Sequence, residues 1–151
     1  MQSKKGSCQI QKSYLLQSSV LHKMPSERTF STYTKQQAHS YAALRGEYSS
    51  SLYNTICEHH ASTGGQFTTL LDVGCGPGNS TRPLAKRFEH AVGVDVGEKM
   101  IEVAREIGGR TAEGRSIAYE LMKEGEFGER FVEKGAVDLI VAGMAVSARI
   151  S

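Results

Sequence analysis

The chain contains 151 residues, which is enough for one globular domain with its own core. Hydrophobic residues make up 39% and charged residues 23%, proportions typical of a soluble fold. The net charge of +2 is too small to indicate a nucleic-acid partner, and no apolar run approaches the roughly 18 residues that span a bilayer.

The first 26 residues contain lysine and serine but no acidic residue and no arginine. A basic, serine-rich and acid-poor start is typical of a mitochondrial transit peptide, but such peptides are usually rich in arginine. We therefore favour a poorly ordered tail over residues 1–29, with Met24 as a more natural start, and keep the transit peptide as the alternative.

The three cysteines, Cys8, Cys57 and Cys75, have neither paired spacing nor the spacing of metal ligands. A sparse, odd-numbered set favours a reducing compartment over a disulfide framework. The sequence thus predicts a cytoplasmic protein without a metal site, with the mitochondrion as the alternative location.

Two helices are expected before the first strand. Residues 35–44 have apolar side chains available for one side of a helix, among them Ala38 and Tyr41. Residues 50–60 repeat apolar side chains at helical spacing, and Ser50 or Ser51 is expected at the N-cap position. A Ser-Thr-Gly-Gly segment then interrupts the pattern.

From residue 68 onward, apolar β-prone segments alternate with helical segments. Strands are predicted over 68–73, 91–95, 117–121 and 137–142, and helices over 80–89, 98–107 and 126–134. This alternation predicts an α/β fold with a Rossmann-like, doubly wound parallel sheet of about four strands. The last strand is almost continuously apolar, which suits a strand covered on both faces.

A glycine-rich turn follows the first predicted strand, at the sheet edge where ligands bind in such folds. Gly74, Gly76 and Gly78 allow positive φ and let a ligand approach the backbone. Dinucleotide sites favour a third glycine where Asn79 stands. Asp72 would repel a phosphate but attract an ammonium group, so it favours S-adenosyl-L-methionine over NAD without deciding the matter.

Asp95 ends the second predicted strand. An acidic residue about 20 positions after the glycine turn can accept hydrogen bonds from ribose hydroxyls. Both NAD and S-adenosylmethionine contain such a ribose, so Asp95 indicates an adenosine cofactor without choosing between them. The alternative is that Asp95 only caps the following helix.

The segment LLDVGCGPG over 70–78 resembles the first motif of class I S-adenosylmethionine-dependent methyltransferases. The residues VGVD over 92–95 resemble the next motif, and VDLI over 137–140 resembles the fourth strand of that family. The upstream segment 41–53 is similar to the entry segment of fungal methyltransferases of the trans-aconitate methyltransferase type. The resemblance implies a methyltransferase acting on a small-molecule methyl acceptor.

The resemblance also implies roles for individual residues. Asp72 and the three glycines surround the methionine part, and Asp95 binds the ribose. Tyr41 and Arg45 close over the cofactor, although a plain stacking pair is an equally good interpretation. The full candidate cofactor-binding set is Tyr41, Arg45, Asp72, Gly74, Cys75, Gly76, Gly78, Asn79, Asp95, Val96, Met100, Glu124 and Ala142.

Within this set, Val96 and Met100 are expected beside the adenine ring, and Glu124 is the nearest candidate for its amino group. Cys75 is interpreted as a small residue in a tight turn rather than a reactive thiol. No residue is identified as a general base, so the catalytic residues are not assigned.

Relatives of this type carry a His-Trp pair near the position of Val146 and continue for about a hundred residues or more. The chain therefore resembles a C-terminally truncated methyltransferase, with a partial domain over 30–145 and an irregular tail over 146–151. Three hypotheses remain: a methyltransferase, an inactive remnant that binds cofactor or another protein, and an NAD-dependent enzyme.

Overall fold

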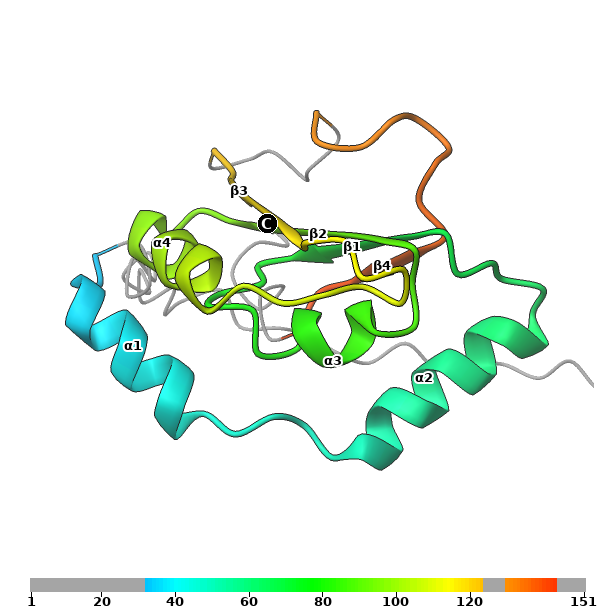
Figure 1. The fold of residues 1–151 in the computed structure, drawn as a ribbon, viewed down its shortest axis with the longest axis horizontal. Helices are drawn as coiled ribbons and strands as arrows, with labels where there is room; N and C mark the ends of the chain where they lie inside the picture. The colour runs from blue at the N-terminus through cyan, green and yellow to red at the C-terminus, as the bar shows by residue number, and fades with distance from the viewer. Residues whose placement is uncertain (1–31, 124–129, 144–151) are drawn as a thin grey trace, which may run out of the picture.

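The computed structural model describes residues 32–123 and 130–143 (Figure 1). The helices in these ranges are α1 (Lys35–Leu44), α2 (Ser50–Ser62), α3 (Thr81–Ala85) and α4 (Glu98–Ile107). The strands are β1 (Thr69–Val73), β2 (His90–Asp95), β3 (Ala118–Leu121) and β4 (Leu139–Val141). All four predicted strands are present, and α1 and α4 have the predicted bounds. The predicted tails over 1–29 and 146–151 lie outside the described residues.

The four strands form one parallel sheet in the order β3-β2-β1-β4. The chain moves outward from β1 to β2 and β3, and then returns to the other side of β1 to form β4. This topology confirms the predicted α/β class with a Rossmann-like parallel sheet. The reversal in strand order lies between β1 and β4, which is where ligands bind in open α/β sheets.

Core residues pack on both faces of the sheet because successive residues of a strand point to opposite faces. Leu70 of β1 packs with Ile101 of α4 in the larger cluster of buried residues. Leu71, the next residue, packs with Val94 and with partly buried side chains of the segment 131–137. Figure 1 accordingly shows α1, α2 and α3 on one side of the sheet and the segment after residue 130 on the other.

Side-chain caps define where α1 and α2 begin. The hydroxyl of Thr34 accepts a hydrogen bond from the Gln37 N–H (3.2 Å), and the Gln37 side chain accepts one from the Thr34 N–H (2.8 Å). This reciprocal pair is a capping box. The predicted cap of α2 at Ser50 or Ser51 was wrong, because the Ser49 hydroxyl accepts from the Leu52 N–H (3.4 Å). Both helices therefore satisfy backbone donors that would otherwise lack an intrahelical partner.

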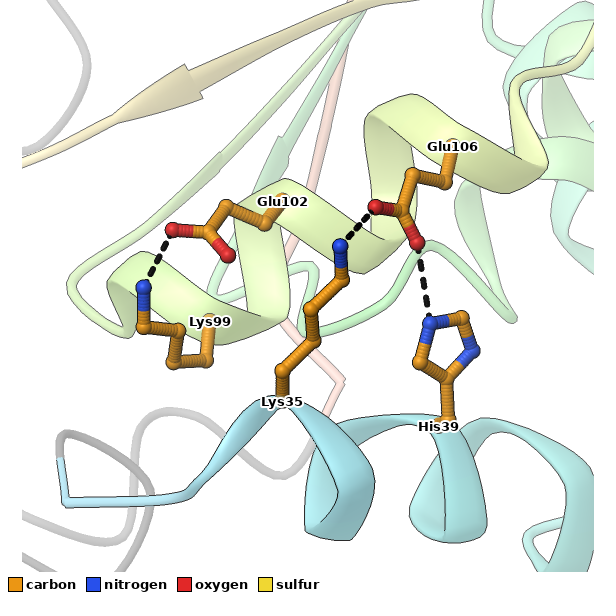
Figure 2. Close-up of polar contacts among 5 residues, drawn as sticks. All are labelled: Lys35, His39, Lys99, Glu102 and Glu106. Atoms are coloured by element: carbon orange, nitrogen blue, oxygen red, sulfur yellow. Dashed lines mark hydrogen bonds and ion pairs between the residues drawn. The ribbon is translucent and has the colours of Figure 1, made fainter.

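Helix α1 packs against α4 through apolar and charged contacts. Ala38 of α1 is fully buried against Met100 of α4. Figure 2 shows Glu106 of α4 pairing with both Lys35 and His39 of α1, the latter at 2.9 Å. These side chains are about half exposed, so water screens each pair and its contribution to stability is small. The buried apolar contact therefore stabilises this end of α1 more than either ion pair does.

Asp138 fixes β4 beside β1. Its Oδ2 atom accepts hydrogen bonds from the backbone N–H groups of Thr68 and Thr69, both at 2.9 Å. Its own N–H donates to the Thr69 carbonyl at 3.0 Å. These contacts set the register that pairs Leu70 with Leu139.

The predicted helix over 80–89 is shorter in the structure, where α3 ends at Ala85. The Phe88 N–H donates to the Ala85 carbonyl (3.1 Å), which is the tighter spacing of a final turn. The Glu89 N–H then donates to the Phe67 carbonyl (2.9 Å). The prediction was wrong at this end because the backbone leaves the helix to enter β2.

The predicted strand over 137–142 is also shorter, and the expectation that both of its faces are covered was wrong. Leu139 and Val141 pack against the larger core cluster, but Ile140 is 62% exposed. Alternation along the strand turns Ile140 to the opposite face. The described residues place no layer over that face at β4.

The predicted helix over 126–134 falls partly on residues 124–129, which lie outside the described residues. The described part, from 130 to 134, consists of turns and a bend, so the prediction was wrong there. The Ala136 N–H closes one of these turns on the Glu133 carbonyl (3.0 Å). None of the helices in the described ranges has the length and apolar character to cross a bilayer.

The buried face of α4 can be tested with one substitution made at two sites. Ile101 is 2% exposed and Ile107 on the same helix is 46% exposed. Ile101→Val is expected to lower the free energy of unfolding by about 0.5–1.5 kcal/mol, because it leaves space in the core. Ile107→Val is the control and is expected to change it by less than about 0.5 kcal/mol. Equal effects in urea denaturation would contradict the assigned face.

Candidate functional site

The glycine turn leaves β1 and is bonded to the end of β2. Gly74, Gly76 and Gly78 have φ of 71°, 55° and 83°, the left-handed region that glycine enters at little cost. The N–H groups of Gly74 and Cys75 both donate to the Val94 carbonyl, at 2.7 and 3.0 Å. The turn is therefore held by the backbone of the neighbouring strand, as the predicted strand-turn-helix unit requires.

The glycines have different surroundings. A Cβ atom on Gly76 would meet nothing within 4 Å. A Cβ atom on Gly78 would lie 2.5 Å from the Tyr119 hydroxyl and 2.8 Å from the Arg82 guanidinium. Gly76 thus faces open space, whereas Gly78 is needed for packing inside the protein. Gly78 was predicted to surround the methionine part of a cofactor. In the structure its α-carbon instead faces the side chains of Tyr119 and Arg82.

The carboxylate of Asp95, at the end of β2, holds the glycine turn through hydrogen bonds. Its Oδ2 atom accepts from the Gly76 N–H (2.8 Å), and its Oδ1 atom accepts from the Gly97 N–H (2.7 Å). Burial raises the pKa of Asp95, while these backbone hydrogen bonds act in the opposite direction. A carboxylate has about four acceptor positions, and backbone N–H groups already occupy at least two of those of Asp95, which is 7% exposed.

Asp72 is a second buried acid, only 1% exposed, in β1. The Thr81 hydroxyl donates to its Oδ2 atom at 2.6 Å. Burial raises the pKa of Asp72 to about 6, the Thr81 hydrogen bond lowers it, and the charge of Asp95 raises it. Most Asp72 carboxyls are therefore ionised at pH 7, and they present a desolvated negative charge that attracts a cationic group.

A hollow of about 50 Å³ opens where the strand order reverses. It is lined by residues of the glycine turn, by Asp72, by the end of α1 and by Gly143, two residues after β4. The predicted site residues that it brings together are Tyr41, Arg45, Asp72, Gly74, Cys75, Gly76 and Asn79. Ligand pockets usually enclose about 300–1,000 Å³, so side chains must move before this hollow admits a cofactor.

Tyr41, Arg45 and Tyr48 form one wall of the hollow and are called the cover residues here. The Arg45 guanidinium donates to the Tyr41 hydroxyl (2.8 Å) and lies 5.5 Å from the centre of its ring. Hydrogen bonding to Tyr48 is the largest of the effects that raise the pKa of Arg45. The predicted stacking pair is present, and its members also line the hollow.

The remaining predicted residues within the described ranges, Gly78 and Asp95 among them, do not line the hollow. Val96 is 41% exposed directly after Asp95, and Ala142 is exposed directly after β4. Met100 is buried between α1 and α4, where it supports α1. Glu124 lies outside the described residues.

Cys75 is buried, and burial raises the pKa of its thiol well above the ordinary value. A buried, protonated thiol is a poor nucleophile. Its environment is that of a small side chain packed in a turn. Among residues 32–123 and 130–143, no three His, Cys, Asp or Glu side chains gather as a metal site would require.

Sequence reasoning did not include four residues that line the hollow, namely Tyr48, Pro77, Ser80 and Gly143. Tyr48 lies in the segment 41–53 that resembles the entry segment of methyltransferases, and Pro77 lies inside the glycine turn. Their positions in the sequence could therefore have predicted that both line the hollow. Gly143 could not be predicted in this way, because only the pairing of β4 with β1 brings it to the site.

A parallel sheet in the order β3-β2-β1-β4, with a glycine turn after β1 that is hydrogen-bonded to an aspartate at the end of β2, defines a Rossmann-like fold. A family described as a methyltransferase domain matches residues 70–149. This match spans more than half of the chain, and the chain belongs to that family.

Among its relatives, methyltransferase cfoB of Aspergillus candidus is 38% identical over 77 residues, which are 50% of this chain and 24% of the relative. Trans-aconitate 2-methyltransferase of Variovorax paradoxus is 56% identical over 39 residues, 24% of this chain and 15% of that protein. The chain thus spans about a quarter or less of the length of these relatives.

Solved structures with a similar fold include the plantazolicin methyltransferase BpumL in complex with SAH. It is 18% identical, with a TM-score of 0.47, and the match covers 78% of this chain and 44% of that one. An S-adenosylmethionine-dependent methyltransferase from Clostridium acetobutylicum is 24% identical with a TM-score of 0.45, covering 58% and 36% of the two chains.

The charge of Asp72 can be tested through the pH dependence of stability. Its folded pKa of about 6 exceeds its ordinary value of 3.8, so the folded protein retains a proton that the unfolded chain has released. This stabilisation is complete below about pH 4 and is lost as the pH rises through 6. Asp72→Asn removes this contribution, so the melting temperature of the variant minus that of the wild type should increase between pH 4 and 7. Glu98→Gln, at the exposed start of α4, is the control; a wild-type slope in Asp72→Asn would contradict the assignment.

Proposed function

We propose that this chain binds S-adenosylmethionine in the hollow beside the glycine turn, as the cofactor-binding part of a small-molecule methyltransferase. The observation that carries the proposal is the buried carboxylate of Asp72, which lines the hollow next to the open side of Gly76. Membership of the methyltransferase domain family supports the same cofactor.

The charge at the site favours this cofactor over NAD. The amino-acid end of S-adenosylmethionine carries an ammonium group, which Asp72 attracts. The pyrophosphate of NAD would be repelled by both Asp72 and Asp95, two acids that are each less than a tenth exposed. Asn79 also occupies the position where dinucleotide sites favour a third glycine.

Each side chain then has a defined part in binding. Asp72 faces the ammonium group, Arg45 faces the carboxylate at the same end, and Asp95 accepts from the ribose. Val96 offers exposed apolar surface for the adenine. Met100 packs against α1, because it is buried in the contact between α1 and α4.

S-adenosylmethionine supplies a methyl group activated by its sulfonium sulfur. The residues around the hollow bind and orient, and proximity with correct alignment supplies much of the rate enhancement in such transfers. A small acceptor is suggested by relatives such as the trans-aconitate 2-methyltransferases, whose names state a small-molecule substrate.

A second candidate is a module that binds the cofactor, or another chain, without catalysis. The exposure of Ile140 favours it, because β4 is the outermost strand among the described residues and presents an apolar side chain that another chain could cover. The two candidates share the cofactor site and differ in whether a methyl acceptor is bound beside it.

Calorimetry with S-adenosylhomocysteine tests the proposed site. Wild-type protein should bind with a dissociation constant below about 1 mM, and Asp72→Asn should bind about tenfold more weakly because a charged partner is lost. Glu98→Gln is the matched control and should bind like the wild type. NAD should give no heat. Absence of binding by wild type at millimolar S-adenosylhomocysteine would contradict the proposal.

A further inference from the structure

The side chain of Asn79 joins the glycine turn to the end of α1. Its Nδ2 group donates to the Ala42 carbonyl at 3.0 Å and to the Arg45 carbonyl at 2.6 Å. The last carbonyls of a helix have no intrahelical donor. Asn79 supplies donors to two carbonyls at this end, from a residue more than 30 positions away in the chain.

Arg82 fixes which way the Asn79 amide faces. Its NH2 group donates to Asn79 Oδ1 at 3.0 Å, and its NH1 group donates to the Pro77 carbonyl at 2.7 Å. The orientation of an asparagine amide is assigned from its hydrogen-bond network. Here a cationic donor faces the oxygen and two carbonyls face the nitrogen, so only one orientation satisfies all the partners.

The two ends of α1 are attached in different ways. The first half is held on α4 by the buried Ala38 and by the pairing of Lys35 and His39 with Glu106 (Figure 2). At the other end, Leu44 is 85% exposed, so apolar burial of this residue does not hold the helix there. The hydrogen bonds from Asn79 therefore carry much of the attachment next to the hollow.

Arg45 links this attachment to ligand binding. Its carbonyl accepts from Asn79, while its guanidinium donates to the Tyr41 hydroxyl and lines the hollow. A shift of the end of α1 would move Arg45 and Tyr41 together. The glycine turn and its cover residues thus share one hydrogen-bonded side chain, that of Asn79.

We propose that Asn79 is a positioning residue that holds the end of α1, and with it Arg45 and Tyr41, over the ligand hollow. This inference rests on the proposed function, because it assigns the cover residues to the same ligand. It changes the predicted role of Asn79, whose amide N–H groups are directed to α1 rather than to a cofactor.

Limited proteolysis of the ligand-free protein tests the attachment without any ligand. Trypsin cleaves after Arg45, whose carbonyl is the one that Asn79 binds. Asn79→Ala should raise the cleavage rate at the Arg45–Gly46 bond several-fold, measured by mass spectrometry against cleavage after Arg130. The chain's other asparagine gives the matched control, since Asn54 accepts a hydrogen bond from Arg87 on the exposed side of α2. Cleavage at Arg45 that is the same in Asn79→Ala, Asn54→Ala and wild type would overturn the proposal.

Binding of S-adenosylhomocysteine separates positioning from direct contact. Loss of two hydrogen bonds should weaken binding by Asn79→Ala about tenfold. Asn79→Asp should bind at least as weakly, because its carboxylate would face the Ala42 and Arg45 carbonyls. If Asn79 contacted the ammonium group of the ligand instead, Asn79→Asp would bind more tightly than Asn79→Ala, and the proposal would be overturned. Failure of wild type to bind would count against the proposed function, and the proteolysis result would still decide the attachment.

Discussion

The hydrogen bond between the Gly76 N–H and the Asp95 carboxylate is the contact on which the site depends. It joins the loop after β1 to the end of β2, at the edge of the sheet formed by the carboxyl ends of the strands. The same carboxylate also accepts from Gly97, which begins the approach to α4. One side chain therefore sets the relative positions of the glycine turn, β2 and the start of α4. A Cβ atom on Gly76 would meet nothing within 4 Å, so the backbone of this turn is open to a ligand at Gly76.

This arrangement has a cost in stability. Asp72 and Asp95 are both buried, burial raises the pKa of each, and the charge of Asp95 adds to the effect on Asp72. A core that served stability alone would not hold two nearby carboxylates. Such a conflict between stability and local chemistry is typical of a functional site. A cationic ligand group in the hollow would relieve it, which connects the stability of the free protein to the charge of the proposed cofactor.

The sequence predicted the parallel fold and most of the hollow, because the signals involved are local. The spacing of apolar residues determines α1 and α4, and the glycines of the turn indicate its backbone conformation. The end of α3 was not predictable, because the Phe67 carbonyl that draws Glu89 into β2 lies far away in the chain. The exposure of Ile140 was missed for a similar reason. An apolar run predicts a strand, but it does not show which segments of the chain cover each face of that strand. The contact of Asn79 with α1 also required the tertiary structure, since an amide has no preferred partner in the sequence.

The central claim is that a ligand with an adenosine and an ammonium group lies against the turn held by Asp95. Nuclear magnetic resonance of protein labelled with ¹⁵N only at glycine observes this turn directly. Addition of S-adenosylhomocysteine should shift the amide resonances of Gly74, Gly76 and Gly97, while Gly64 and Gly135 remain in place. Ligand binding that leaves Gly76 and Gly97 unshifted would contradict the claim, because the ligand would then lie elsewhere on the protein.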